Sequence, residues 1–244
     1  MTAASTVSAL WLYPVQSLRG QKMDALDFAA DSLRFDRWYG IENAESGEMA
    51  SASSKRDWRP LITWDAAYLS PLDPVGEVPK VEIRFPDGAH VVSDDPKVDQ
   101  VLSERLARPV TLRGRAGVRA PARYRLAACH IITNATLRRL SALYPSGVFA
   151  PERFRPNVLL DCGETVGFIE QAWLGRRMAA ASGLVLQASE DCKRCGLTTR
   201  AQGDLPSDPG ILHTVMLENK TNAGIYAEVA KAGRMSMGDA MVVG

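Results

Sequence analysis

The feature that most constrains the fold is a series of short β-type runs in the second half of the chain. From Asn157 onward the sequence contains NVLLD, GLVLQAS, GIYAEV and RMSMGDAMVV, separated by stretches that include Gly, Pro and Asp. Short strands with turn residues between them are typical of β-barrels and of mixed α+β domains. A doubly wound sheet is disfavoured, because it needs regular alternation of strands and helices. We therefore predict an α+β fold that is mainly β.

The first half adds a strand and a hairpin. SALWLYPVQSLRG begins as an apolar strand and breaks at Pro14 and Gly20. VEIRFPDGAHVV alternates apolar and polar residues on either side of the turn formed by Pro86, Asp87 and Gly88. This pattern predicts a β-hairpin.

Two helices are predicted between these runs. DDPKVDQVLSERLARP has Asp95 as a plausible N-cap and Pro96 at the first helical position. TNATLRRLSALYP has Thr133 or Asn134 as its cap, and Pro145 limits it. The two helices flank TLRGRAGVRAPARYRL, which is rich in Arg, Gly, Ala and Pro and is the best candidate for a linker. We place the domain boundary there, with one domain over residues 1–115 and a second over residues 116–244.

Composition limits the classes of partner. The chain has 244 residues, 46% of them hydrophobic, and a formal net charge of +1, so nothing favours nucleic acid or an acidic membrane as a partner. Four cysteines in a chain of this length do not suggest a disulfide scaffold. We expect a cytoplasmic protein. The linker arginines are interpreted as a solvated segment, with docking of an acidic electron-transfer protein as the alternative; they are Arg113, Arg115, Arg119, Arg123 and Arg125.

Common catalytic signatures are missing from the sequence. It contains no G-x-S-x-G elbow, no P-loop, no H-E-x-x-H and no G-x-G-x-x-G after a strand. A Ser-His or Cys-His pair stays open, because such partners meet in space rather than in sequence. Cys129 and His130 are predicted to lie in a buried strand.

The stretch EDCKRCGLTTR carries the most distinctive chemistry. Its cysteines, Cys192 and Cys195, form a single C-x-x-C unit. Zinc, a redox dithiol and two unremarkable loop cysteines are the alternatives, but structural zinc usually needs two such units or added histidines. Lys193 and Arg194 would favour a thiolate, and the two threonines after Gly196 supply hydroxyls. One thiolate among cationic and hydroxyl groups suits a soft metal centre or a bulky anionic cofactor.

Six motifs, in order along nearly the whole chain, resemble those of MOSC proteins with an N-terminal MOSC β-barrel domain. They are WLYPVQSLRG, LRFDRWYGI, ERFRPNVLL, FIEQAWLGRRM, CKRCGLTT and GRMSMGDAMVV. The group includes amidoxime-reducing molybdoenzymes and YcbX-like bacterial reductases. The resemblance implies that residues 1–115 form the N-terminal MOSC β-barrel domain, packed on a C-terminal MOSC barrel with a few short helices.

The resemblance also implies a molybdenum cofactor (molybdopterin), whose metal is held by a pterin dithiolene and one protein cysteine. Cys195 matches the metal-ligating and catalytic cysteine. The positions that match cofactor-contacting residues, or resemble them more loosely, are Ser17, Arg37, Thr133, Asn134, Thr136, Arg155, Asn157, Arg194 and Thr198. Guanidinium groups and hydroxyls of this kind are suited to a pterin phosphate. The alternatives are that Arg153 and Arg155 are surface residues and that Arg37 pairs with Trp38.

The sequence departs from the family in three places. Gln16 replaces a usual lysine, and RAQGDLPSDPG replaces a D-P-x-T-G segment near the expected substrate mouth. The chain also ends at Gly244 without the ferredoxin domain of YcbX-like proteins. We therefore expect electrons to come from a separate protein.

Three functions follow as hypotheses. The first is an oxidoreductase that uses molybdenum to reduce small N-oxygenated molecules. The second is a sulfur carrier, or a protein of carbon–sulfur chemistry, that uses a persulfide or thiolate on Cys195 without a bound cofactor. The third is a cofactor-binding module without catalysis.

Overall fold

The computed structural model describes residues 5–53, 56–73, 75–114 and 128–244. The chain divides into two compact units that interleave along the sequence. Unit 1 contains residues 1–11, 22–34 and 127–244, and unit 2 contains residues 12–21 and 35–126. The predicted domain boundary at residues 115 and 116 lies outside the described residues, as do Arg115, Arg119, Arg123 and Arg125 of the predicted linker.

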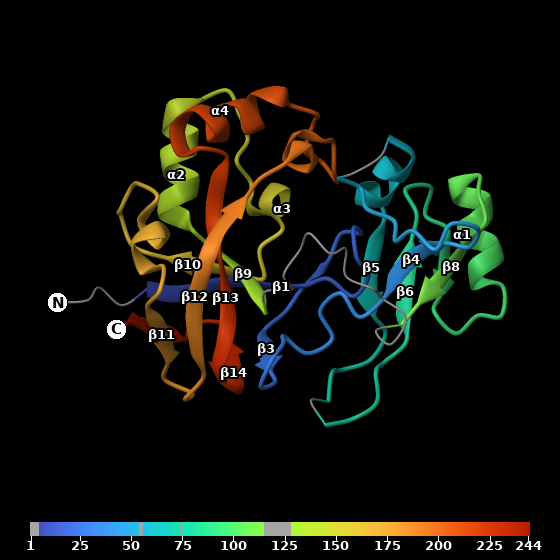
Figure 1. The fold of residues 1–244 in the computed structure, drawn as a ribbon, viewed down its shortest axis with the longest axis horizontal. Coiled ribbons are helices and arrows are strands. Elements are labelled where there is room, and N and C mark those ends of the chain that lie inside the picture. Colours follow the sequence, from blue (N-terminus) through green and yellow to red (C-terminus); the bar gives the residue numbers. More distant parts are fainter. Residues whose placement is uncertain (1–4, 54–55, 74, 115–127) are drawn as a thin grey trace. The chain divides into compact units, whose positions relative to one another are not determined.

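Unit 1 is built on a closed seven-stranded β-barrel (Figure 1). The strands follow one another around the barrel as β10, β9, β13, β12, β11, β15 and β1, and β1 pairs with β10 to close it. Only β9 and β10 run parallel among these neighbours. The bounds are β1 (Ser5–Leu12), β9 (Cys129–Thr133), β10 (Val158–Asp161), β11 (Arg177–Ala180), β12 (Val185–Lys193), β13 (Asn222–Lys231) and β15 (Ala240–Val243).

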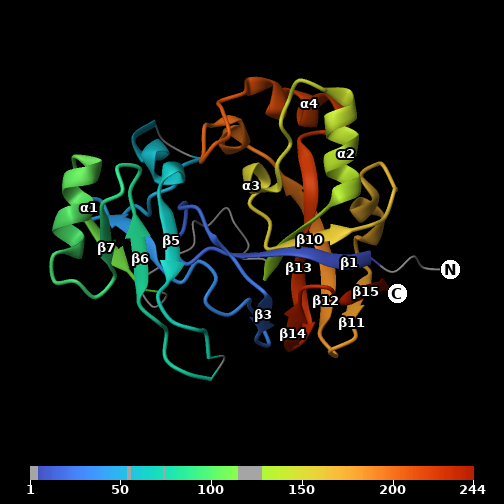
Figure 2. The same ribbon diagram turned by 180° about the vertical axis from the view of Figure 1, so that it is seen from behind.

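Closure explains why strands from both ends of the chain are needed. Antiparallel strands leave unpaired backbone groups at a sheet edge, and a barrel removes both edges. β1 supplies the closing strand between β10 and β15, as Figure 2 shows from behind. Three irregularities of register in the β12–β13 pair accompany its long course around the barrel. A separate pair, β3 (Ala25–Phe28) with β14 (Gly233–Ser236), completes the strands of this unit apart from the short β2 (Gln21–Lys22).

Helices cover part of the barrel in unit 1. They are α2 (Asn134–Leu143), α3 (Pro151–Phe154), α4 (Pro209–Asn219) and two 3-10 helices, η2 (Ile169–Trp173) and η3 (Gly196–Thr199). α2 lies beside α4 in both views, and their apolar side chains meet those of β9 and α3 in one core (Figures 1 and 2). The buried members of that core are Ile132, Leu140, Phe149, Phe154, Ile211, Val215 and Ala223.

Unit 2 contains two small antiparallel sheets. One is formed by β5 (Asp65–Tyr68), β6 (Val81–Arg84) and β7 (His90–Val92), and the other by β4 (Gly40–Asn43) and β8 (Val110–Arg113). The 3-10 helix η1 (Arg56–Thr63) and α1 (Val98–Leu106) accompany them. β6 and β7 are the predicted hairpin, and Gly88 adopts a φ of +86° in its turn, which glycine tolerates without strain.

The predicted fold class is confirmed: the protein is α+β and mainly β. The helix predicted from Asp95 begins later, at Val98, because the Asp95 carboxylate accepts a hydrogen bond from the N–H of Lys97 in a tight turn. The second predicted helix is α2, and Thr133 is its N-cap, with Oγ1 accepting from the N–H of Thr136. α4 was not predicted. Among the described residues, no helix is long and apolar enough to span a membrane.

Candidate functional site

The two cysteines of the C-x-x-C unit lie in opposite environments. Cys192 lies near the end of β12 with no exposed surface, whereas Cys195 follows the strand and is exposed. Side chains alternate between the two faces of a strand, so Cys192 points into the barrel and the chain then leaves the sheet before Cys195. Both thiols are free. Within the described ranges, no group of three or more His, Cys, Asp or Glu side chains could hold a metal ion.

Arg194 holds the chain in place on the N-terminal side of Cys195 through hydrogen bonds. Its Nη1 donates to the Sγ of Cys192 at 2.6 Å, and its Nη2 donates to the carbonyl oxygen of Phe154 at 2.5 Å. The guanidinium lies 5.5 Å from the centre of the Phe154 ring. The backbone N–H of Arg194 donates to the carbonyl of Thr221 at 2.7 Å. Cys192 therefore acts here as a buried acceptor that orients the arginine next to Cys195.

Thr198 fastens the chain on the C-terminal side of Cys195. Cys195 precedes η3, and its carbonyl accepts two hydrogen bonds from Thr198, one from the backbone N–H at 3.1 Å and one from Oγ1 at 3.0 Å. Thr198 has no exposed surface. Its hydroxyl thus bonds to the backbone of Cys195, the predicted ligand residue, and holds that backbone in place.

Arg153 lies fully buried beneath the same segment. Its Nε donates to the carbonyl of Val148 at 2.8 Å, Nη1 donates to those of Thr198 and Arg200 at 3.2 and 3.3 Å, and Nη2 donates to that of Pro206 at 2.7 Å. Burial lowers the pKa of the guanidinium, and the charge of Asp208 opposes that shift. The alternative that Arg153 is a surface residue is therefore wrong.

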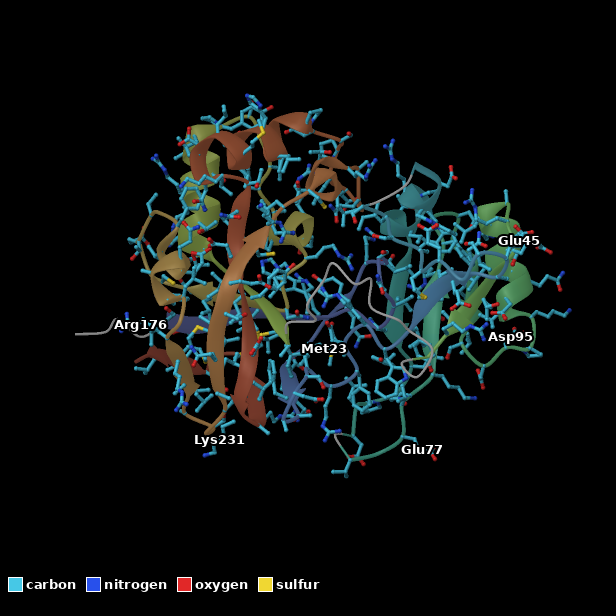
Figure 3. All side chains as sticks on the ribbon, in the orientation of Figure 1. Met23, Glu45, Glu77, Asp95, Arg176 and Lys231 are labelled. Atoms are coloured by element: carbon cyan, nitrogen blue, oxygen red, sulfur yellow. The ribbon has the colours of Figure 1, made fainter. Side chains whose placement is uncertain are left out.

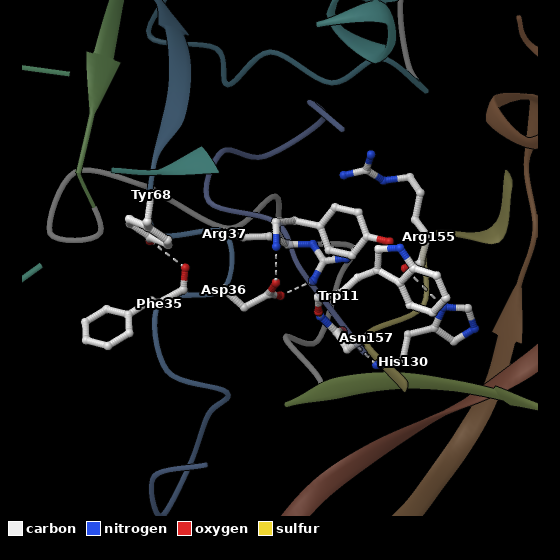
Figure 4. Close-up of polar contacts among 9 residues, drawn as sticks. Trp11, Phe35, Asp36, Arg37, Tyr68, His130, Arg155 and Asn157 are labelled. Carbon is white, nitrogen blue, oxygen red and sulfur yellow. Dashed lines mark hydrogen bonds and ion pairs between the residues drawn. The ribbon is translucent and has the colours of Figure 1, made fainter. Parts of the chain in front are cut away.

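Arg155 and Asn157 follow in the same motif. Arg155 caps α3 in the left-handed region with a φ of +53°, and it is also buried, with 8% of its surface exposed. Its carbonyl oxygen lies 3.4 Å from Nδ1 of His130, and Figure 4 shows its guanidinium extending away from that ring. The surface alternative is therefore wrong for Arg155 as well.

Asn157 connects three strands of the barrel. Its Nδ2 donates to the carbonyl of Trp11 at 3.3 Å, and its Oδ1 accepts from the N–H of His130 at 3.1 Å (Figure 4). Its backbone pairs with the same two residues. Asn157 has no exposed surface, and Cys129 and His130 lie in the buried strand predicted for them.

Thr133, Asn134 and Thr136 bond to other groups of the protein, the two threonines to Glu170 and Asn134 to Asp161 and Cys162. The hydroxyls of Thr133 and Thr136 donate to the two carboxyl oxygens of Glu170 at 2.8 and 2.6 Å. Glu170 is 1% exposed, and burial raises its pKa against the lowering effect of these hydrogen bonds. Asn134 bonds to the Asp161 carboxylate through Nδ2 and accepts from the N–H of Cys162 through Oδ1 at 2.9 Å.

Ser17 and Arg37 belong to unit 2. Both have positive φ, +70° and +48°, a conformation that costs energy for residues with a side chain. Ser17 Oγ accepts from the N–H of Ala52 at 3.2 Å. Arg37 forms an ion pair with Asp36, donates its N–H to the carbonyl of Tyr13 at 2.6 Å and stacks at 4.9 Å over the Tyr13 ring. The cation–π alternative thus holds in kind, with Tyr13 in place of Trp38.

The structure therefore brings two of the predicted segments together, the Arg153–Asn157 motif and the stretch from Cys192 to Thr198. It also adds residues that the sequence did not single out for this role. The carbonyl of Thr221 accepts from Arg194, and the ring of His130 contacts the carbonyl of Arg155. No sequence motif predicts these contacts, because they involve backbone carbonyls.

A family model described as the MOSC domain matches residues 124–242. These residues are a MOSC domain. The match contains both segments that meet at Cys195, and the family is associated with binding of molybdenum cofactor. A search of curated proteins finds no match to the sequence.

Two solved structures resemble the chain that contains this MOSC domain. The YUAD protein from Bacillus subtilis is 12% identical, with a TM-score of 0.53 over 98% of this chain and 95% of its own. YiiM from Geobacillus stearothermophilus is 14% identical, with a TM-score of 0.35 over 48% of this chain and 54% of its own. At such identity, the likeness to YUAD is one of fold.

Proposed function

We propose that the MOSC domain binds a molybdenum cofactor through Cys195. We further propose that the protein is an oxidoreductase that reduces small N-oxygenated molecules. One observation carries the proposal: Cys195 is an exposed thiol between Arg194 and Thr198, and both of these residues bond to the buried motif that contains Arg153. A ligand thiol needs both properties, because it must reach the metal and must not move with the surface.

The residues at this site fit such a group. A soft metal takes a sulfur ligand, and Cys195 is the exposed one of the four cysteines. Arg153 and Arg194 form no ion pair with any carboxylate in the part of the chain that the structure describes, since their bonds run to carbonyls and to Cys192 Sγ. Arg153 is fully buried near Asp208, so the partly buried Arg194 is the one of the two whose charge could attract an anion over a short range.

Within this proposal, Cys195 holds the metal and Arg155 contributes charge to the anionic part of the cofactor. The cofactor supplies the redox chemistry when it is bound. Ser17 and Arg37 stay predictions as contacts of the pterin phosphate. For Thr133, Asn134, Asn157 and Thr198 we propose positioning roles, because their side chains are engaged with other groups of the protein.

The substrate class and the electron donor rest on the resemblance to amidoxime-reducing proteins. We propose amidoximes, hydroxylamines or N-oxides as substrates, with electrons from a separate protein. The segment from Arg200 to Gly210, which departs from the family pattern, is where substrate preference would change.

A second candidate is supported by the same exposed thiol. The Cys195 thiolate would attack the outer sulfur of a donor persulfide, take that sulfur and release the donor thiolate. Cys192 would not resolve such a persulfide, because it is buried and bonded to Arg194. This chemistry needs no metal.

Metal analysis separates the two candidates. Wild-type protein from cells that make the cofactor is compared with Cys195→Ser and with Cys162→Ser, a control at a partly buried cysteine of the same unit. We expect molybdenum near one atom per chain in wild type and in the control, and its loss from Cys195→Ser. Metal-free wild-type protein carrying one extra sulfur on Cys195 would support the second candidate and contradict the first.

A further inference from the structure

The two sides of Cys195 are bonded to one dipeptide, Arg153-Phe154. On the N-terminal side, the Arg194 guanidinium reaches across to the Phe154 carbonyl at 2.5 Å. On the C-terminal side, the Arg153 guanidinium reaches back to the Thr198 carbonyl at 3.2 Å, and Thr198 in turn holds the Cys195 carbonyl. Each segment thus donates an arginine to the backbone of the other.

Arg153 extends this arrangement into the loop that follows η3. It donates to the carbonyls of Arg200 and Pro206, which lie at the two ends of that loop. Inside the loop, Gln202 and Leu205 exchange two backbone hydrogen bonds of 3.0 Å, and Asp208 N–H donates to Thr199 at 2.8 Å. The loop therefore closes on itself, and the Arg153 guanidinium of α3 bonds to both of its ends.

Only an arginine can make this set of bonds. A guanidinium has five N–H donors in a rigid plane, whereas a lysine ammonium has three donors at a single point. Arg153 uses Nε and both Nη atoms, on acceptors from four residues. A lysine at position 153 would keep the charge but leave some of these carbonyls without a donor.

We propose that Arg153 and Arg194 form a reciprocal clamp that fixes the Cys195 thiol in its exposed position. Arg153 also sets the conformation of the loop from Arg200 to Pro206, which begins five residues after Cys195 and thereby limits the size of the substrate that reaches the thiol. Both arginines are positioning residues. The clamp concerns the protein alone, and only its effect on substrate rests on the proposed function.

The clamp is tested first by amide hydrogen exchange in cofactor-free protein. The variants are Arg153→Lys and Arg194→Lys. The control is Arg176→Lys, an exposed arginine beside β11 that donates to the carbonyl of Gly244 (Figure 3). In Arg153→Lys we expect exchange at residues 198–208 to rise by about tenfold or more, with β12 and β13 unchanged, as for local opening. Unchanged exchange at residues 198–208 would overturn the clamp, whether or not the protein binds molybdenum.

The second test uses metal-loaded protein and a pair of amidoximes, one small and one bulky. For Arg153→Lys we expect the KM ratio of the two substrates to change by about tenfold, with both KM values measured on the metal-loaded fraction. A purely structural role would lower the amount of loaded protein and leave that ratio unchanged.

Should Arg153→Lys not fold, Pro206→Gly loosens the same loop from its exposed side and should shift the ratio in the same direction. An unchanged ratio in the folded variant would overturn the role in substrate selection. Absence of molybdenum from wild type would instead overturn the proposed function.

Discussion

The segment around Cys195 in unit 1 and the turn around Arg37 in unit 2 both depend on arginine side chains. The groups that bond to these arginines differ between the two regions. Arg37 pairs with the neighbouring Asp36 carboxylate, whose side chain is 6% exposed. Arg153 and Arg194 bond to carbonyl oxygens and to a thiol, which carry no full charge. The comparison indicates that unit 2 pairs the charge of Arg37 with an adjacent carboxylate, whereas the hydrogen bonds of Arg153 and Arg194 in unit 1 run to uncharged acceptors.

The largest difference is expected from replacing the two arginines by methionine. Arg153→Met removes a fully buried guanidinium that donates to the carbonyls of four residues, so we expect a loss of about 3 kcal/mol or more in the free energy of unfolding. Arg37→Met removes one partner of the buried Asp36 carboxylate, which keeps the N–H of Tyr13 as a donor, so its loss should be smaller, about 1–2 kcal/mol. Denaturant unfolding of both variants measures the contrast. Equal losses would break the comparison.

A smaller effect is expected at Tyr68, which supports the Arg37 turn from inside unit 2. Its buried hydroxyl donates to the carbonyl of Phe35 at 2.7 Å, and burial, together with nearby Asp36, raises its pKa. Phe35 has a φ of +62°, so this bond holds a strained residue. We expect Tyr68→Phe to cost about 1–2 kcal/mol in unfolding free energy. Val81→Ala is the control: it loosens the packing of the same sheet and leaves the Tyr68 hydroxyl in place. An unfolding free energy of Tyr68→Phe equal to that of the wild type would show that the turn does not depend on this hydrogen bond.

A pH-dependent effect is expected at Glu170. Burial raises its pKa above the ordinary value of 4.5, so the folded protein retains this proton at pH values where the unfolded chain has lost it. Stability contributed by this group is therefore greatest at low pH and declines as pH rises above 4.5, by at most about 1.4 kcal/mol per pH unit. Glu170→Gln should remove that decline, as measured by the free energy of unfolding at a series of pH values from 4.5 upward. The same slope in variant and wild type would contradict a raised pKa at Glu170.

The smallest effect is expected from salt. The test compares alkylation of Cys195 by iodoacetate, an anion, and by neutral iodoacetamide, with a small free thiol as the reference. If positive charge acts at Cys195, the ratio of the iodoacetate rate to the iodoacetamide rate should be about two- to fivefold higher for Cys195 than for the free thiol at low salt. Added salt should reduce this preference, because screening shortens the range of the charge. Arg194→Gln should reduce it as well. A preference that is absent at low salt would show that the charge does not act at the thiol.

Much of the fold followed from local pattern. The β-type runs after Asn157 became β10, β12, β13, β14 and β15, because alternation and turn residues determine short strands locally. α4 was missed although Asp208 and Pro209 mark its start, because its sequence is apolar on all sides and gives no helical periodicity. Which strands close the barrel depends on pairing across the whole chain, which no local pattern reveals.

The candidate site was predictable only in part. Cys195 and the Arg153–Asn157 motif could be singled out by residue type and resemblance. The roles of Arg153 and Arg194 could not, since a backbone carbonyl is an acceptor at every position and leaves no trace in the sequence. The different burial of Cys192 and Cys195 depends on where β12 ends, and strand ends are the least certain part of a sequence-based prediction.

The most direct test of the central claim is the sulfur coordination of molybdenum, measured by X-ray absorption at the metal edge. Wild-type protein and Arg176→Lys should each show one sulfur ligand more than Cys195→Ser reconstituted with the same cofactor. Identical sulfur coordination in wild type and Cys195→Ser would contradict the account, because the metal would then be held without this thiol.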